Sequence, residues 1–445
     1  MKTEFYINRF QAMKKLIFPL LIFGNLFAQQ SKLTLEESVE IGLINSKLIK
    51  ISESKVISAD ARVTEFTSQM LPKISFGAGY NYLNLTKPSK IAFGPAPINV
   101  INPFSSYNLS LNIQLPIFTG FQLSSLRSAA KYNHLATNIE HLKNINNVAL
   151  EIHFAFWNLF KTEKSVELIK EYLLSLNEHL NQSKEFLDNG LVTVNDYLKI
   201  KVQLSNVELE LIDAKNKMEI ARATFNRAIG FNLGERTQIK SDLELSEYIY
   251  PEYDDILAEA LSIREELRIL DFRIKGGEEQ ITAVNSGWWP KLYASGNFYL
   301  SNINAETFSI SNQDLRLWFV GLSLSWSLWD WGNTSSKSIQ ARNEVIQSKE
   351  SLQLLKEQIE LEVFNSYLSL QSELEKIEIS KLALESAEEN YRITTQKYQY
   401  QLATSNDLLD SEVELFDAKT KLLFAQADYQ LAKVKLNVAI GRKIY

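Results

Sequence analysis

The chain contains no cysteine and little glycine, proline, histidine or methionine. Its 445 residues include 16 Gly, 9 Pro, 4 His and 4 Met. Without cysteine the chain has no disulfide, thiolate metal site, cysteine nucleophile or acylated cysteine anchor. Because most of the Gly and Pro residues lie near strand-like stretches, the rest of the chain can be helical over long distances.

Long apolar runs are also missing after the first 28 residues. The stretch LIFPLLIFGNLFA at 16–28 follows Lys14 and Lys15 and is typical of an export signal, so we predict a signal peptide over 1–28. Its removal reduces 47 basic and 53 acidic residues to 43 and 52, a net charge of −9 that argues against nucleic acid as a partner. No later stretch reaches the roughly 18 apolar residues of a spanning helix, so a membrane crossing would require strands.

Catalytic and metal-binding motifs are absent from the sequence as well. The four histidines lie on one helical stretch without the HExxH spacing, and GAG at 77–79 lies within a strand instead of before a helix. We therefore expect no enzymatic activity, no metal site and no cofactor.

An internal duplication is the most informative feature that is present. The matching segments are LPKISFGAGYNYL (71–83) with WPKLYASGNFYL (289–300), IFTGFQLSS (117–125) with WDWGNTSS (329–336), and GLVTVNDYL (190–198) with QLATSNDLL (401–409). Each half predicts a helix, two strands around a polar loop, a very long helix and a returning helix. We assign a first repeat to 29–230, a linker or equatorial segment to 231–256 and a second repeat to 257–445.

The returning helix of each half carries a sustained heptad of alternating large and small residues. It runs from Tyr197 to Ala228, and a shift of 211 residues gives the equivalent seam from Leu408 to Ala439. The shared register favours a repeated wall element, with an ordinary helical-bundle core as the alternative.

Four stretches alternate apolar with small polar residues, as membrane-spanning strands do. They are 74–82, 107–117, 292–300 and 317–329. Any one of them could instead be a hairpin on a soluble core, but the tryptophans favour a membrane. The residues that flank the second strand pair are Trp288, Trp289, Trp329 and Trp331, which predict an aromatic girdle against outer-membrane lipid.

Four strands are too few to close a barrel, so the chain must oligomerise. The helical stretch from Phe121 to Asn189 would span on the order of 100 Å at 1.5 Å per residue. Such a length suits a conduit that continues the strands across the periplasm.

In combination, these features resemble the TolC-type outer-membrane efflux proteins over nearly the whole mature chain. The residues that carry the resemblance are the two repeats, the LP and WP dipeptides before the strands, and the turns FLDNGLVTVNDYL (186–198) and YQYQLATSNDLLD (398–410). The resemblance implies a membrane α+β fold: a homotrimer whose twelve antiparallel strands form one β-barrel continuous with a long α-helical coiled-coil barrel.

The resemblance also implies a location and a function. The protein would be in the cell outer membrane with a long periplasmic extension, as the passive exit duct of a tripartite efflux pump. Its partners would be a periplasmic adaptor protein and an inner-membrane pump. An exit duct for type I protein or peptide secretion is one alternative, and a structural coiled-coil protein of the envelope is another.

Site residues follow from the same resemblance. An aperture would be formed by Asp407 and Asp410, with Tyr398 at an aromatic position of the gate and Asp196 as the acid present in the first repeat. An Arg found in some members is Ala403 here. The turn residues expected to contact the adaptor are Gly190, Leu191, Thr193, Leu402 and Thr404.

Overall fold

The computed structural model describes residues 32–83, 90–93, 96–99, 104–240, 252–303 and 310–445. The predicted signal peptide and the middle of the predicted linker lie outside these residues. Within the described part of the chain, no helix has the length and apolar composition needed to cross a membrane.

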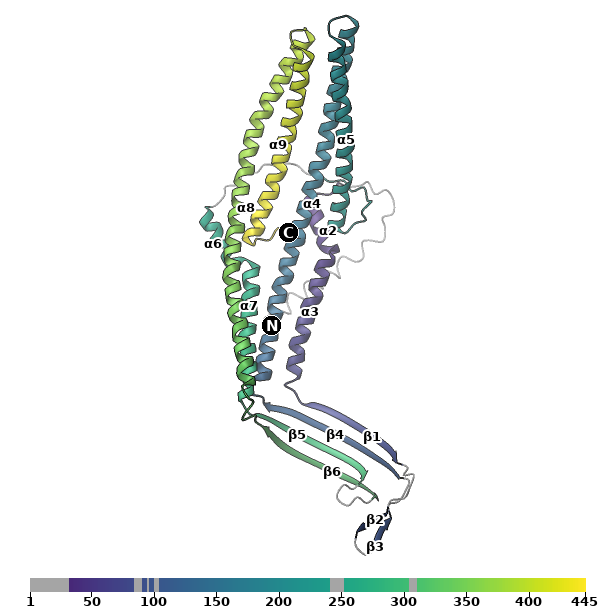
Figure 1. The fold of residues 1–445 in the computed structure, drawn as a ribbon, viewed down its shortest axis with the longest axis vertical. Coiled ribbons are helices and arrows are strands. Elements are labelled where there is room, and N and C mark those ends of the chain that lie inside the picture. The colour runs from purple at the N-terminus through teal and green to yellow at the C-terminus, as the bar shows by residue number, and fades with distance from the viewer. Residues whose placement is uncertain (1–31, 84–89, 94–95, 100–103, 241–251, 304–309) are drawn as a thin grey trace, which may run out of the picture.

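The two repeats contain the same elements in the same order (Figure 1). The first consists of α2 (Leu35–Asn45), α3 (Lys47–Ser68), β1 (Lys73–Leu83), β4 (Phe104–Phe118), α4 (Gln122–Asp188) and α5 (Val194–Ile229). The second consists of α6 (Tyr253–Ile263), α7 (Glu265–Asn285), the 3-10 turn η1 (Ser286–Trp288), β5 (Lys291–Ile303), β6 (Ile310–Ser325), α8 (Asn333–Gln399) and α9 (Ser405–Ile440). Helices α4 and α8 each have 67 residues, and α5 and α9 each have 36, which confirms the duplication.

Three sequence expectations about element boundaries were wrong. A pair of helices, not one, precedes the strands of each repeat, because Ser46 and Arg264 adopt extended ψ values near 120° that end one helix and begin the next. The expected polar loop at 84–106 contains a small hairpin, β2 (Lys90–Phe93) and β3 (Ala96–Asn99). Strand β6 ends at Ser325 and does not reach 329; just beyond it, the indole of Trp326 donates to the carbonyl of Trp288 at 3.2 Å.

The four long strands form one antiparallel sheet in the order β1-β4-β5-β6. Paired residues lie on the same face, so the register can be read as rows across the sheet. One row on one face is Phe76, Leu111, Phe298 and Trp318, and one row on the other face is Lys73, Gln114, Ser295 and Gly321. The predicted two-faced strands are therefore combined into one two-faced sheet.

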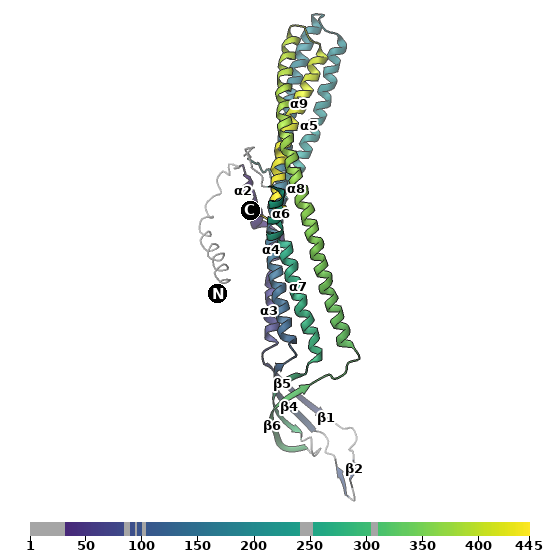
Figure 2. The ribbon, with the colours of Figure 1, turned by 90° about the vertical axis from the view of Figure 1, so that its left-hand side faces the viewer.

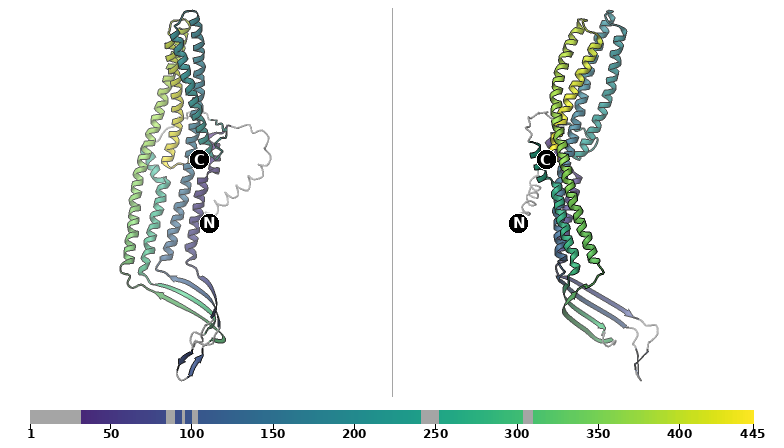
Figure 3. Two further views of the ribbon diagram at one scale, coloured as in Figure 1. Left: turned by 45° about the vertical axis from the view of Figure 1, so that its right-hand side comes forward. Right: turned by 60° about the vertical axis from the view of Figure 1, so that its left-hand side comes forward.

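The helices repeat the lateral order of the strands. Near the sheet, α4 lies between α3 and α7, and α7 lies against α8; toward the tips, α4 lies between α5 and α9, and α9 lies against α8 (Figures 1 and 3). Helices α3 and α7 lead into β1 and β5, and helices α4 and α8 follow β4 and β6, so each helix is joined to the strand at the same place in the order. Seen from the side, sheet and helices form one elongated wall with the hairpin tips at the end away from the sheet (Figure 2).

Two glycines close the returning helices at the middle of this wall. Gly230 ends α5 with φ +81° and Gly441 ends α9 with φ +97°, a left-handed conformation that favours glycine. The amide of Asn45 donates to the carbonyl of Ile229 at 3.0 Å, beside the first of them. The triplet Ala-Ile-Gly therefore occurs in both halves, at 228–230 and at 439–441, as a helix end packed on the break between paired short helices.

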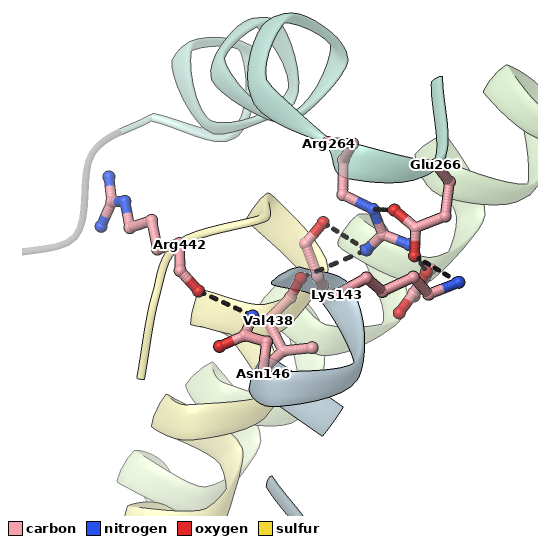
Figure 4. Close-up of polar contacts among 8 residues, drawn as sticks. Lys143, Asn146, Arg264, Glu266, Val438 and Arg442 are labelled. Atoms are coloured by element: carbon pink, nitrogen blue, oxygen red, sulfur yellow. Dashed lines mark hydrogen bonds and ion pairs between the residues drawn. The ribbon is translucent and has the colours of Figure 1, made fainter. Parts of the chain in front are cut away.

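In the second repeat the corresponding contact is made by a buried arginine (Figure 4). The guanidinium of Arg264 donates to the carbonyls of Ala439 at 2.8 Å and Val438 at 3.3 Å, and to carboxylates of Glu266 at 3.0 Å and Glu362 at 2.8 Å. One side chain therefore caps α9 and joins it to α7 and α8.

The segment after α9 is held along α4 at the same level. The side-chain amide of Asn146 donates to the carbonyl of Arg442 at 3.1 Å (Figure 4). Its oxygen accepts from the backbone N–H of Ile444 at 3.2 Å. An apolar core that includes Phe156 and Phe225 lies beside these contacts. The two repeats are therefore locked together at mid-length by both polar and apolar packing.

The close approach at Gly230 predicts a graded effect of alanine substitution. A Cβ at Gly230 would lie 2.5 Å from the Cβ of Asn45, whereas one at Gly190, which also has positive φ, would have nothing within 4 Å. Gly190→Ala should cost about 1 kcal/mol of backbone strain, and Gly230→Ala about 1–3 kcal/mol more from overpacking. Thermal unfolding in detergent, followed by circular dichroism, measures both, and equal melting temperatures would contradict the close approach.

Candidate functional site at the helical tips

Both helical hairpins turn by the same backbone path at their tips. The α4–α5 turn has a positive φ of 72° at Gly190, and the α8–α9 turn has one of 60° at Gln401, which is the equivalent position 211 residues later. Thr193 and Thr404 then begin the returning helices as N-caps. The left-handed backbone conformation costs a glutamine on the order of 1 kcal/mol. The second tip therefore holds backbone strain at Gln401 that glycine avoids in the first tip.

The acids expected at the aperture include two helix-capping residues. Asp407 accepts from the backbone N–H of Thr404 at 2.8 Å and from its hydroxyl at 2.7 Å, while its own N–H donates to that hydroxyl at 3.2 Å. Asp196 forms the same reciprocal box with Thr193. The repeated Thr-x-x-Asp spacing in the turns is a capping-box signature that sequence reasoning missed.

The cap also affects the ionisation of Asp407. The hydrogen bond from the Thr404 hydroxyl holds the pKa of Asp407 below its ordinary value. A depressed carboxyl pKa adds stability above the pKa of the unfolded chain, and this contribution is lost as pH falls through the folded pKa. The cap is therefore fully formed at neutral pH. Asp410 lies one turn further along α9 and is exposed.

Tyr398 lies apart from these acids. Its side chain is buried, with its ring centroid 5.0 Å from that of His179 and 5.5 Å from that of Phe186. Burial raises the pKa of its hydroxyl. In the described chain Tyr398 packs α8 against α4, and it does not share a surface with Asp407 and Asp410.

The residues expected to meet an adaptor do lie together at the far end of the wall (Figure 1). Leu191 is 50% exposed and Leu402 is 77% exposed, which is high for leucine. The exposed residues around them are Gly190, Thr193 and Thr404. The Lys199 ammonium lies 3.3 Å from the Asn406 side-chain oxygen and connects the two tips.

The four tryptophans lie at the opposite place in the molecule, where the sheet meets the helices. Trp329 and Trp331 pack edge to face with centroids 5.8 Å apart, and Trp288 lines a shallow groove with them. Trp289 instead packs against Phe118 and Phe121. All four side chains are at least half exposed, so the predicted girdle residues are at one level and accessible.

A buried polar cluster near the tips was missed by sequence reasoning. Its centre is the pair His179 and Glu412, with Nδ1 to Oε2 at 3.2 Å, and both side chains are almost fully buried. In the sequence, His179 is one of four histidines on one helical stretch that lack the HExxH spacing. The available signal was that His179 and Ser183 continue the apolar seam of α4 that includes Leu176. Among the described residues, no group of three or more His, Asp and Glu side chains is placed to hold a metal ion.

Comparison with known proteins identifies the family. The sequence profile of the outer membrane efflux proteins matches residues 40–231 and 256–442, one segment in each repeat. The chain belongs to the outer membrane efflux protein family. It is thus an outer-membrane protein that serves as an efflux duct, which confirms the expected location and class of function, and the family consists of channels and not enzymes.

Individual relatives agree over nearly the full length. The outer membrane protein TolC of Vibrio cholerae is 21% identical over 443 residues, covering 96% of both chains. Among solved structures, the outer membrane protein VceC of Vibrio cholerae superposes with a TM-score of 0.76 at 17% identity, covering 92% of this chain and 97% of that one. The Campylobacter jejuni CmeC outer membrane channel superposes with a TM-score of 0.79 at 16% identity, covering 92% and 85%. The fold class expected from the sequence is confirmed.

The capping role of Asp407 predicts a difference between the two neighbouring acids. Asp407→Ala should speed amide hydrogen exchange in the first turn of α9, because it removes the carboxylate oxygen that accepts two hydrogen bonds from Thr404. Asp410→Ala, which removes an exposed charge from the same helix, should leave this exchange unchanged. Equal exchange in the two variants at neutral pH would exclude the capping role.

Proposed function

We propose that three copies of this chain form an exit duct that conducts small molecules from a periplasmic adaptor and an inner-membrane pump to the exterior. The observation that carries the proposal is the continuous wall of strands and helices. Four strands from each copy would give a barrel of twelve, within the range of closed membrane barrels. The two repeats, assigned to 29–230 and 257–445, would each supply two of the four strands, with the linker at 231–256 near mid-length.

The two edges of the wall support an assembly in which one edge of each copy contacts the opposite edge of the next copy. Strands β1 and β6 each have a partner on one side only within the described sheet, and unpaired strand edges are templates for further strands. The α8 edge carries exposed apolar residues at intervals of seven or eight, namely Ile339, Ile346, Leu354, Leu361 and Leu368. The opposite edge carries exposed apolar residues on α3 and α5, including Ile51, Ile57, Val202 and Leu209. Contact between unlike edges generates a closed ring when the rotation permits.

The two faces of the sheet support a membrane position. The face with Phe76 and Trp318 would contact outer-membrane lipid, and the face with Gln114 and Ser295 would line the passage. The tryptophans at the sheet–helix junction would lie at the inner interface of that membrane. The helices would then extend into the periplasm by about 100 Å.

The tips support two further roles. Exposed Leu191 and Leu402 are suitable contacts for an adaptor, because large apolar side chains at a protruding end otherwise remain in water. Asp407 and Asp410 from three copies would surround the entrance with carboxylates. Rings of acidic side chains favour cations.

Purified protein tests the duct directly. Native mass measurement should give a trimer, and planar-bilayer recording should show a conducting, cation-preferring pore. Asp407→Asn with Asp410→Asn should weaken the preference for cations, because it removes the ring of negative charge.

The control is the exposed acid Glu235, which lies far from the tips in the linker. Glu235→Gln should leave selectivity unchanged. A monodisperse monomer without conductance would refute the duct. A conducting trimer whose ion selectivity is unchanged by the double substitution would refute only the role of Asp407 and Asp410 at the entrance.

Adaptor docking predicts a loss of export without a loss of assembly. Leu191→Asp and Leu402→Asp each place a charge in the proposed apolar contact and should together abolish export from cells. Trimer formation and outer-membrane insertion should remain intact, because neither side chain is buried in the chain. Leu233→Asp, at an equally exposed leucine in the linker, is the matched control. Export that survives both tip substitutions would place the docking surface elsewhere.

A further inference from the structure

We propose that the buried cluster around His179 and Glu412 fixes the axial register of hairpin α8–α9 against α4, and thereby sets the height at which Asp407 and Asp410 stand at the tip. The proposal rests on the proposed function for the role of these acids. The position of the hairpin itself can be measured independently of transport.

Both ring nitrogens of His179 have partners on α9. Nδ1 lies 3.2 Å from Oε2 of Glu412, and Nε2 lies 3.1 Å from the hydroxyl of Ser405. Ser405 and Glu412 lie on the same face of α9, about two turns apart, and both contact one side chain of α4. The Tyr398 ring from α8 packs edge to face on the imidazole, with a centroid distance of 5.0 Å.

The second oxygen of Glu412 extends the cluster back to α4 and on to α8. Ser175 donates to Oε1 of Glu412 at 2.9 Å, and the Tyr391 hydroxyl lies 3.0 Å from the Ser175 hydroxyl. The hydrogen bonds therefore connect three helices. His179 and Glu412 are both 3% exposed, so water does not offer alternative partners for the pair.

Arg264 and Asn146 hold the other end of α9 at mid-length, and in the half of the helix next to the tip apolar packing alone leaves the register weakly defined. The buried alanines of α9 recur every seven residues, at Ala418, Ala425, Ala432 and Ala439. Larger apolar seam residues such as Leu408, Leu415 and Leu422 lie one turn away between them, so a displacement by one turn would still bury apolar side chains. A buried polar pair does not repeat, and separating it leaves groups unpaired at a cost of about 1–3 kcal/mol each. Such single polar positions are known to specify register in coiled coils.

The cluster lies directly beside the acids that it would position. Ser405 is the first residue of α9, and Asp407 is two residues further on. The first repeat has no such cluster at the equivalent positions, because the residues 211 places before Ser405 and Glu412 are Val194 and Lys201, both exposed. The register device is thus specific to the hairpin that carries the Asp-x-x-Asp pair.

Cysteine cross-linking tests the register, since the chain has no cysteine of its own. Lys199→Cys is combined with Asn406→Cys, its present neighbour at the tip. In parallel it is combined with Leu402→Cys or Asp410→Cys, which lie about one turn to either side on the α8–α9 hairpin. A short bismaleimide reports which pair is adjacent. The protein with an intact cluster should favour position 406 over its two alternatives by roughly tenfold.

His179→Leu with Glu412→Leu should reduce this preference to less than about twofold, since no buried polar pair then excludes other registers. The melting temperature should be unchanged or higher, because apolar replacement of a buried pair is often neutral or stabilising. Ser405→Ala removes the hydrogen bond to His179, and Ser175→Ala removes the bonds to Glu412 and Tyr391, each with little change in volume. Either variant should reduce the preference by roughly threefold. These two variants keep the test decisive if the double leucine variant does not fold.

The matched control is the pair Glu171 and Lys419, an exposed ion pair that also joins α4 to α9. Glu171→Leu with Lys419→Leu should retain the preference for position 406. A preference that survives in the double leucine and serine variants, or that is lost equally in the control, overturns the register role. Bilayer conductance of the same samples separates the two proposals. If the protein conducts and the cluster variants keep the hairpin register, only this inference is refuted. If the cluster variants change the register and the protein does not conduct, only the duct is refuted.

Discussion

Helix α4 packs most extensively against five other helices along its 67 residues, and the rest of the structure depends on how it does so. A helix with one apolar stripe can have one principal neighbour, whereas α4 needs contact surfaces on opposite sides. Its buried residues accordingly change along its length, from Ala136 and Ile139 near the sheet through Phe156 and Leu159 at mid-length to Leu176 near the tip. The shorter helices are stacked end to end along it, α3 before α5 on one side and α7 before α9 on the other.

This stacking creates helix ends in the middle of a wall, where backbone groups need partners. The structure satisfies them with side chains from the breaks between paired short helices. Asn45 donates a hydrogen bond to a carbonyl at the end of α5, and Arg264 donates to a carbonyl at the end of α9. The buried guanidinium is compensated by Glu266 and Glu362, so the charge that caps one helix also joins two others. Burial lowers the pKa of His153 nearby and outweighs the opposing hydrogen bond with the carbonyl of Ile444, which favours a neutral imidazole inside this junction.

Near the tip, the buried residues of α4 change from apolar side chains to the polar side chains of His179 and Ser183. The duct proposed for this protein needs helices that are stable over a long distance but an entrance whose acids stand at a defined level. Alanine-rich heptads provide close packing without a unique register. A single buried hydrogen-bonded cluster supplies the register, while capping boxes fix the backbone of the two turns.

Periodicity determined much of the fold from the sequence alone. Alternation with a period of two indicated which strand residues share a face, and the heptad and the shift of 211 residues indicated equivalent helices, because these features arise from local backbone geometry. The family and the exposed tip leucines were likewise predictable. The tertiary structure alone decided which elements are neighbours, including the order β1-β4-β5-β6, the breaks at Ser46 and Arg264, and the burial of Tyr398. The partner of His179 lies 233 residues away in Glu412. No local pattern encodes such a contact, because it exists only when two repeats with their own periodicities are packed side by side.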